Sequence, residues 1–182
     1  MAENTKLNSK QPHTVAEILH QRALALAQHS PEPAAAETFF DAVLFRLADE
    51  TYAVAVEFLQ DVLSRHNVTP VPCTPPFVAG IINVRGQIVS VLNLKALFNL
   101  PDTAGVEIHN VLLLANDEMR FGIAADEVFG VRQLLKSDLQ PPPTTLDGFK
   151  GEYVAGITAE MVIVLDAGKM LSDPRLIVHE TV

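Results

Sequence analysis

The stretch that decides the fold is GIINVRGQIVSVLNL, residues 80–94, in which an arginine and a glycine interrupt an otherwise apolar run. Gly86 can adopt the positive φ of a tight turn, so the segment predicts a β-hairpin with strands at 79–84 and 87–92. Both strands are apolar on both faces, which predicts that other parts of the protein cover both faces. Arg85 is then expected at the rim of a junction between two packed β-units.

A short helix is predicted directly after this hairpin. Asn93 is well placed to cap a helix over residues 94–98, and Asn99 can adopt the left-handed conformation that ends it. Much later in the chain, Asp166 stands in the equivalent cap position before residues 167–171. The same local pattern therefore occurs twice.

The recurrence extends to a longer internal repeat. VLFRLADETYAVAVEFLQDVL, residues 43–63, aligns with VLLLANDEMRFGIAADEVFGV, residues 111–131, with one extra residue, Arg120, in the second copy. Both copies then contain VAGI, at 78–81 and 154–157, before a strand that ends in Val-Leu. Each copy has about 70 residues and about five short strands, too few to bury a convincing core alone. The repeat predicts two similar β-units that pack on each other, each closed into a small barrel without exposed edges.

Composition excludes several classes of function. The 13 basic and 22 acidic residues give a net charge of -9 with no basic patch, which argues against a nucleic acid partner. No apolar run reaches the roughly 18 residues of a membrane span, so no direct membrane insertion and a cytoplasmic location are expected. The single cysteine, Cys73, excludes an intramolecular disulfide and is interpreted as a buried or half-buried structural thiol.

The N-terminal region has a different character. Thr14 and Glu17 have capping-box spacing, which predicts an amphipathic helix over about residues 14–28. A linker follows, so residues 1–38 are interpreted as an extension and residues 39–182 as the main domain. The apolar stripe of the helix could dock on this domain or on a partner.

The order of YAVAVEFLQDVL, VPCTPPFVAGIINVRGQIVSVLNL, FGIAADEVFGV, GEYVAGI and VIVLDAGKML resembles the CheW-like adaptor proteins of bacterial chemotaxis over about residues 39–176. The resemblance implies an all-β fold of two five-stranded SH3-like β-barrels packed on a shared core, with short helices. It implies no catalytic activity and no cofactor. It also implies two partners, a CheA-type histidine kinase and a methyl-accepting chemoreceptor, and recruitment to receptor arrays.

The resemblance also implies a receptor-binding groove between the barrels. One wall is the hairpin motif and the other is the strand over residues 54–59. Arg85 would anchor a partner's carboxylate or backbone carbonyls there, or it would pin the protein's own two halves by an internal salt bridge. The expected groove residues are Val54, Val56, Glu57, Asn83, Val84, Arg85 and Gly86.

Candidate catalytic groups are few. Glu57 and Asp126 occupy equivalent places in the two copies, which favours a repeated structural task, such as accepting backbone N–H bonds, over acid–base chemistry. His66, His109 and His179 are too far apart in the sequence to predict a metal site, and no phosphate-binding or nucleophile motif occurs. The chain is predicted not to be an enzyme. Two alternatives stay open: a small-ligand sensor or enzyme that uses the cleft between the barrels, and an inhibitory decoy that binds the kinase only.

Overall fold

The computed structural model describes residues 38–64, 67–101, 108, 110–143 and 148–176. The chain divides into two units, Met1–Glu37 and Thr38–Val182, and all of the described residues belong to the second. The predicted helix over residues 14–28 and its linker lie outside the described residues, as do His66, His109 and His179.

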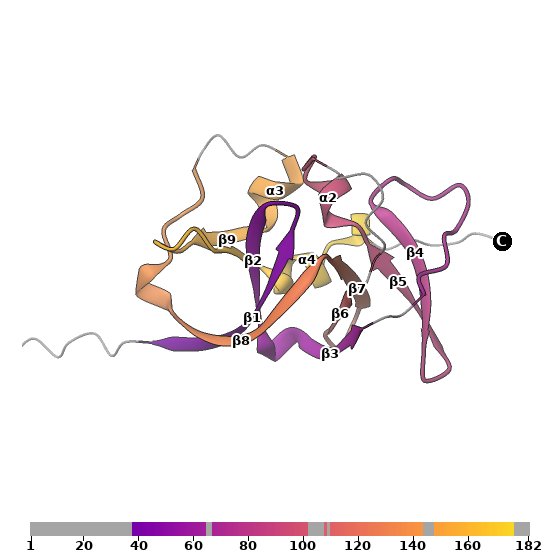
Figure 1. The fold of residues 1–182 in the computed structure, drawn as a ribbon, viewed down its shortest axis with the longest axis horizontal. Coiled ribbons are helices and arrows are strands. Elements are labelled where there is room, and N and C mark those ends of the chain that lie inside the picture. The colour runs from indigo at the N-terminus through magenta and orange to yellow at the C-terminus, as the bar shows by residue number, and fades with distance from the viewer. Residues whose placement is uncertain (1–37, 65–66, 102–107, 109, 144–147, 177–182) are drawn as a thin grey trace, which may run out of the picture. The chain divides into compact units, whose positions relative to one another are not determined.

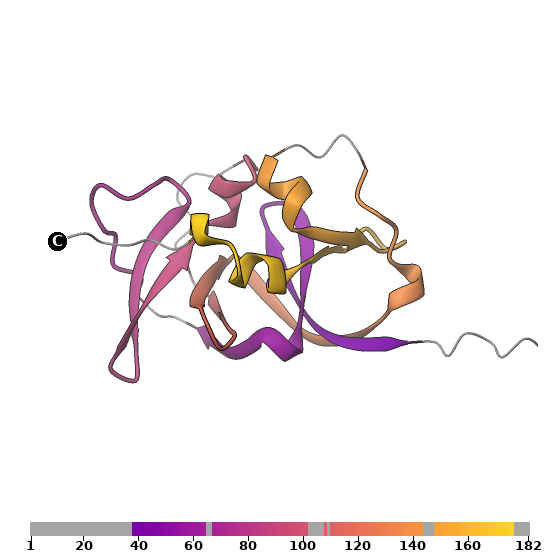
Figure 2. The same ribbon diagram turned by 180° about the vertical axis from the view of Figure 1, so that it is seen from behind.

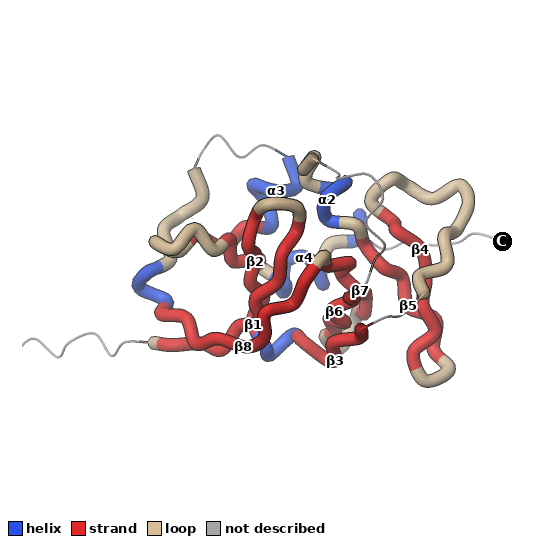
Figure 3. The backbone as a smooth tube through the Cα atoms, viewed as in Figure 1, coloured by secondary structure: helices blue, strands red, loops and turns tan. Residues whose placement is uncertain are grey.

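Short strands are the main regular secondary structure of the described chain (Figure 3). The first copy of the repeat contains β1 (Phe39–Leu47), β2 (Glu50–Ala55), η1 (Val56–Phe58), β3 (Leu59–Ser64), β4 (Val78–Val84), β5 (Gln87–Leu92) and α2 (Leu94–Leu97). The second copy contains β6 (Asn110–Ala115), β7 (Arg120–Ala125), β8 (Glu127–Leu135), η2 (Lys136–Asp138), α3 (Gly148–Tyr153), β9 (Val154–Ile157), β10 (Ile163–Leu165), α4 (Ala167–Leu171) and η3 (Pro174–Leu176).

The strands form two five-stranded sheets, in the order β8-β1-β2-β10-β9 for sheet A and β3-β6-β7-β5-β4 for sheet B (Figure 1). Replacing each strand by its counterpart in the other copy converts one order into the other. The all-β fold of two five-stranded units is therefore confirmed. The expectation that each copy builds its own unit is wrong, because each sheet takes strands from both copies. Strand pairing depends on contacts between distant residues, which a repeat in the sequence does not specify.

The repeated VAGI motif lies where each sheet closes. Thr69 pairs with Ile81 of β4, and Gln140 pairs with Ile157 of β9, each through two backbone hydrogen bonds of 2.9–3.0 Å. A Cβ on Gly80 would lie 2.2 Å from the carbonyl oxygen of Thr69, and a Cβ at the corresponding Gly156 would lie 2.9 Å from that of Gln140. The motif therefore recurs because both closures bring a second backbone against the strand.

Both sheets contribute to one shared core. Its largest cluster includes Phe45 and Tyr52 from sheet A and Leu92 and Phe121 from sheet B. The rings of Phe45, Tyr52 and Phe98 stack in succession, with centroids 6.0 and 6.1 Å apart. Smaller clusters lie within each sheet. The expectation of two β-units around a shared core is thus confirmed.

The local predictions around the opening stretch are confirmed, but its burial is not. Asn93 accepts hydrogen bonds from Lys95 N and Ala96 N at the start of α2, and the predicted hairpin strands are β4 and β5. The hairpin is not covered on both faces, however, because Ile88 of β5 is 64% exposed. Its tip projects beyond the rest of sheet B in two opposite views (Figure 1, Figure 2).

The interpretation of Cys73 as a buried or half-buried thiol is wrong. Cys73 is exposed and has a φ of 63° in the Pro-rich segment that precedes β4. A left-handed residue in a surface turn directs its side chain away from the packed strands, a feature that flanking prolines do not reveal.

Candidate functional site

The tip of the β4–β5 hairpin presents Arg85 to solvent. Arg85 has a φ of 52° and Gly86 a φ of 86°, the two positive values of a type I′ turn, and Asn83 Oδ1 accepts a hydrogen bond of 2.8 Å from Gly86 N. The sequence predicted the glycine at this turn but not the left-handed arginine beside it. The turn leaves the Arg85 side chain 88% exposed.

A polar hollow of about 290 Å³ lies beside this tip, at the end of sheet B where β3, β5 and β7 begin. Arg85 Nη2 lies 3.7 Å from Asp61 Oδ2 on β3, and Arg120 Nη1 donates a hydrogen bond to Gln87 Oε1. The side chains that line this Arg85 hollow are Gln60, Asp61, Val84, Arg85, Gln87, Leu113 and Arg120.

The only ion pair of Arg85 among the described residues is the one with Asp61. Both partners belong to the first copy of the repeat and to sheet B, so the pair does not join the two halves of the protein. Exposed ion pairs of this kind contribute little to stability because solvent screens them and the long side chain loses freedom. The Arg85 guanidinium is therefore available to a partner.

The structure does not gather all the expected groove residues in one place. Val54 is fully buried in the shared core, where no partner can contact it. Val56 is half-buried and Glu57 is exposed in η1, and both line a different hollow, of about 770 Å³. This Phe58 hollow is lined by Phe39, Phe40, Asp41, Ala55, Val56, Glu57, Phe58, Lys136, Leu139, Ala155, Val164, Leu165, Asp166 and Ala167.

Sequence reasoning missed an exposed apolar group on sheet A. Phe129 and Val131 of the edge strand β8 are 53% and 62% exposed, and Phe39 of the neighbouring β1 is also exposed. Their segments look like core strands in the sequence. Only the pairing, which places β8 at an edge, shows that these apolar side chains face solvent.

The two equivalent carboxylates behave differently. Asp126 accepts a hydrogen bond of 2.7 Å from Ala48 N and one of 2.9 Å from Lys95 Nζ. It therefore ties the β1–β2 turn of sheet A to helix α2 at the crossover between β7 and β8, which confirms a structural role. The same expectation is wrong for Glu57, which is exposed and for which the described residues provide no hydrogen bond or ion pair.

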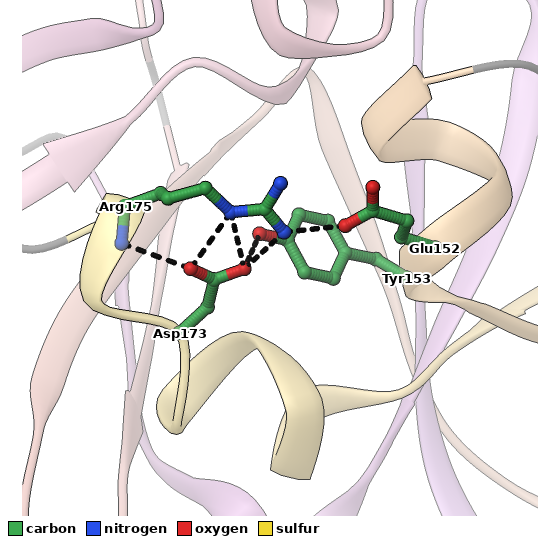
Figure 4. Close-up of polar contacts among 4 residues, drawn as sticks. All are labelled: Glu152, Tyr153, Asp173 and Arg175. Atoms are coloured by element: carbon green, nitrogen blue, oxygen red, sulfur yellow. Dashed lines mark hydrogen bonds and ion pairs between the residues drawn. The ribbon is translucent and has the colours of Figure 1, made fainter.

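A polar cluster at the end of the domain is fully engaged in internal contacts (Figure 4). The Tyr153 hydroxyl donates to Asp173 Oδ2 at 2.6 Å, and Arg175 binds both Asp173 and Glu152 while lying 4.8 Å from the centroid of Phe149. Hydrogen bonds from Arg175 hold the pKa of the Asp173 carboxyl well below its usual range. Burial, and then the bond to Asp173, raise the pKa of Tyr153 well above its usual value. No member of this cluster is poised as a base or nucleophile, so the cluster is a structural clamp.

The described residues show neither a cluster for a metal ion nor a membrane-spanning helix. No group of three His, Cys, Asp or Glu side chains in this part of the chain could hold a metal ion. Among the helices that the structure describes, none is both long and apolar enough to cross a membrane.

Comparison with known proteins identifies the architecture. The family model described as "CheW-like domain" matches residues 41–175, nearly the whole of the unit that contains the two sheets. The chain belongs to the CheW-like domain family. It is 28% identical over 165 residues to the "Chemotaxis protein CheW" of Treponema pallidum, a match that covers 87% of this chain and 93% of the relative. It is also 30% identical over 159 residues to "Protein FrzA" of Myxococcus xanthus, covering 85% and 94% of the two chains.

A solved structure supports the same assignment. The "scaffolding protein TtCheW" of Thermoanaerobacter tengcongensis superimposes with a TM-score of 0.62 at 28% identity, covering 72% of this chain and 87% of that one. Members of the CheW family are scaffolds without catalytic activity. This CheW-like protein is therefore a chemotaxis adaptor that couples chemoreceptors to a CheA-type histidine kinase, and it is not an enzyme, as the sequence predicted.

Proposed function

We propose that this adaptor binds its receptor and its kinase on opposite faces of the β4–β5 hairpin. Side chains alternate between the two faces of a strand. Val84 and Gln87 face the Arg85 hollow, whereas Ile88 of β5, paired with Asn83 of β4, lies exposed on the outer face of the hairpin. The receptor helix would lie at the hollow, and the kinase would meet the exposed edge and end of the barrel.

The observation that carries this proposal is the exposed guanidinium of Arg85 beside a polar hollow. A partner that covers it gains a planar donor at the centre of an interface, where arginine is enriched among the residues that dominate binding. Val56 and Glu57 would extend the receptor surface along η1, and buried Val54 would support that wall from within. Asn83 and Gly86 would act by shaping the turn that presents Arg85.

The kinase would use a different physical contact. An exposed apolar side chain beside the edge strand β4 suits contact with another small barrel, because backbone groups of the strand supply hydrogen bonds while the side chain supplies burial. Ile88 is the large apolar residue placed for this role on the hairpin. Interfaces of modest size give weak individual affinities, which suits an array held together by many contacts.

Binding measured with two purified partners tests the proposal. The partners are a chemoreceptor signalling-tip fragment and the regulatory domain of a CheA-type kinase from the same organism. Arg85→Ala should lose the receptor and keep the kinase, and Ile88→Asp should do the opposite. Parallel loss of both partners in each variant, with folding intact, would contradict the use of separate faces.

The alternatives give different results in the same experiment. An inhibitory decoy would retain the kinase and never bind a receptor. A small-ligand sensor would show saturable calorimetric binding of a carboxylate or phosphate that Arg85→Ala abolishes, with neither protein retained. Cytoplasmic recruitment to receptor arrays belongs to the proposal as well, and a fluorescent fusion should form polar or membrane-associated foci that disappear in Arg85→Ala.

A further inference from the structure

Arg120 is a position at which the two copies of the repeat differ in charge. The strand registers pair Arg46 with Thr51 in the first copy and Ala115 with Arg120 in the second, so Arg120 takes the place of Thr51 and the extra residue expected from the sequence is not present. The structure places Arg120 at the first position of β7, with its side chain exposed at the Arg85 hollow. The proposed adaptor function assigns Arg120 no task.

The topology brings Arg120 to the same place as Arg85. Strands β5 and β7 are parallel, so Gln87 and Arg120 start neighbouring strands at one end of sheet B. Arg120 Nη1 donates to Gln87 Oε1, and both side chains line the hollow. Within the described residues Arg120 forms no ion pair, and the Arg85 guanidinium has only the 3.7 Å contact with Asp61.

The charges around the hollow do not balance. Two guanidinium groups face one carboxylate, and Oδ1 of that carboxylate already accepts a hydrogen bond of 2.8 Å from Val62 N. The hollow is thus locally positive in a chain whose net charge is -9. At about 290 Å³ it lies at or below the lower limit of pockets that enclose small-molecule ligands, and it is large enough for one side chain of a partner.

We propose that the Arg85 hollow recognises a carboxylate side chain, Glu or Asp, on the receptor helix, and that Arg120 is its second binding arm. This inference rests on the proposed receptor site. Guanidinium groups bind a planar carboxylate through paired, charge-assisted hydrogen bonds. Asp61 disfavours a doubly charged phosphate more than a singly charged carboxylate, because like charges repel. Arg120 would therefore set the preference for an acidic receptor residue.

The first test measures affinity for the receptor signalling-tip fragment at several salt concentrations. Arg120→Gln should weaken binding at least fivefold at low salt and reduce its salt dependence, because one screened charge contact is gone. Arg120→Lys should recover part of the affinity. Arg46→Gln is the matched control, since Arg46 forms an exposed ion pair with Glu127 on sheet A, and it should bind as wild type. Arg120→Glu should be rescued by one Glu→Arg or Asp→Arg change on the receptor fragment.

The second test needs no receptor. Glutarate is titrated into the full-length protein while NMR follows the Arg120 Nε–Hε and Gly86 amide signals, with inorganic phosphate as the comparison anion. Wild type should show shifts at these signals that Arg120→Gln loses, and glutarate should act at lower concentration than phosphate. Equal shifts in wild type and Arg120→Gln, or stronger phosphate binding, would overturn the inference. Glutarate binding without receptor binding would uphold the chemistry of the hollow and reject the proposed receptor site.

Discussion

At the scale of single residues, the hairpin tip combines a strained backbone with an exposed charge. A left-handed φ is uncommon for arginine, and the Asn83 side chain offsets part of its cost by binding Gly86 N. Within the protein the Arg85 side chain forms only one exposed ion pair. A substitution can therefore remove this side chain and keep the turn. Substitutions at Arg85 therefore test partner binding with little effect on the fold.

Arg85→Ala is expected to leave the melting temperature within a few degrees of wild type and to weaken receptor association by about 2 to 4 kcal/mol. Scanning calorimetry and titration calorimetry measure the two quantities. Arg85→Lys serves as control, because it keeps the charge and loses the planar donor. A large drop in melting temperature with unchanged receptor affinity would show that Arg85 is structural.

Gly80 and Gly156, the glycines of the two VAGI motifs, should differ in how much stability a substitution costs. Gly80→Ala should lower the free energy of unfolding by about 3 kcal/mol or more, because φ is 146° and the new Cβ would meet the backbone of Thr69. Gly156→Ala should cost less, since its contact is longer and its φ is ordinary. Gly168→Ala in α4 is the control and should be neutral or stabilising by up to about 1 kcal/mol. Urea denaturation compares them, and equal losses at 80 and 156 would argue against the backbone-clash explanation.

At the scale of elements, the crossovers between sheets differ although the repeat makes them equivalent. Asp126 and Lys95 form a nearly buried pair, with side chains 16% and 10% exposed, that holds the crossover between β7 and β8. At the crossover between β2 and β3, Phe58 instead packs on the shared core, and Glu57 faces solvent. One crossover is thus held by charge and the other by apolar packing.

Lys95→Met is expected to destabilise the fold by about 3 kcal/mol, because it leaves the buried Asp126 carboxylate without its cation. Denaturant unfolding measures the loss. The matched control is Arg132→Gln, which removes an exposed pair with Glu160 and should cost less than about 1 kcal/mol. Similar losses in the two variants would show that the crossover pair is screened like a surface pair.

The clamp that joins α3 to η3 predicts a dependence of stability on pH. The folded-state pKa of Asp173 is depressed by Arg175, so this carboxyl stabilises the fold above its unfolded pKa of about 4 and loses that contribution as the pH falls. Asp173→Asn should therefore be less stable than wild type at pH 7 and should lose less stability on acidification. Melting temperatures between pH 7 and pH 2 test this. Parallel curves for the two proteins would contradict it.

At the scale of the whole molecule, the described unit consists of two copies that exchange strands. Sheet A combines β1 and β2 with β8, β9 and β10, and sheet B combines β3, β4 and β5 with β6 and β7. Neither copy can complete a sheet or bury its share of the common core without the other. The β4–β5 hairpin, which carries the two proposed partner surfaces, is therefore part of one unit that folds and unfolds cooperatively.

Fragments 38–101 and 108–182 should each be unfolded in isolation, because each lacks strands that its partner supplies. Mixing them should restore the β-rich circular dichroism spectrum and a cooperative melting transition. The intact protein should unfold in one step by both near-ultraviolet and far-ultraviolet signals. An independently folded fragment would show that one copy is self-sufficient despite the exchange.

The sequence by itself determined the features that depend on neighbouring residues. The hairpin at Gly86, the Asn93 and Asp166 caps, the internal repeat and the family resemblance all rest on patterns within short segments. Turn and cap preferences act over a few residues, so they can be read without the rest of the chain. The all-β fold class followed from the same local signals.

Only the tertiary structure decided which strands pair, which side chains face solvent, and which residues meet at the Arg85 hollow. The exchange of strands, the burial of Val54, the exposure of Ile88 and the contact between Arg120 and Gln87 all depend on residues far apart in the sequence. An apolar strand has the same local pattern in a core and at an edge. The environment of a strand is set by long-range packing. The same packing places Asp126, and not Glu57, where its carboxylate accepts a backbone hydrogen bond from another part of the fold.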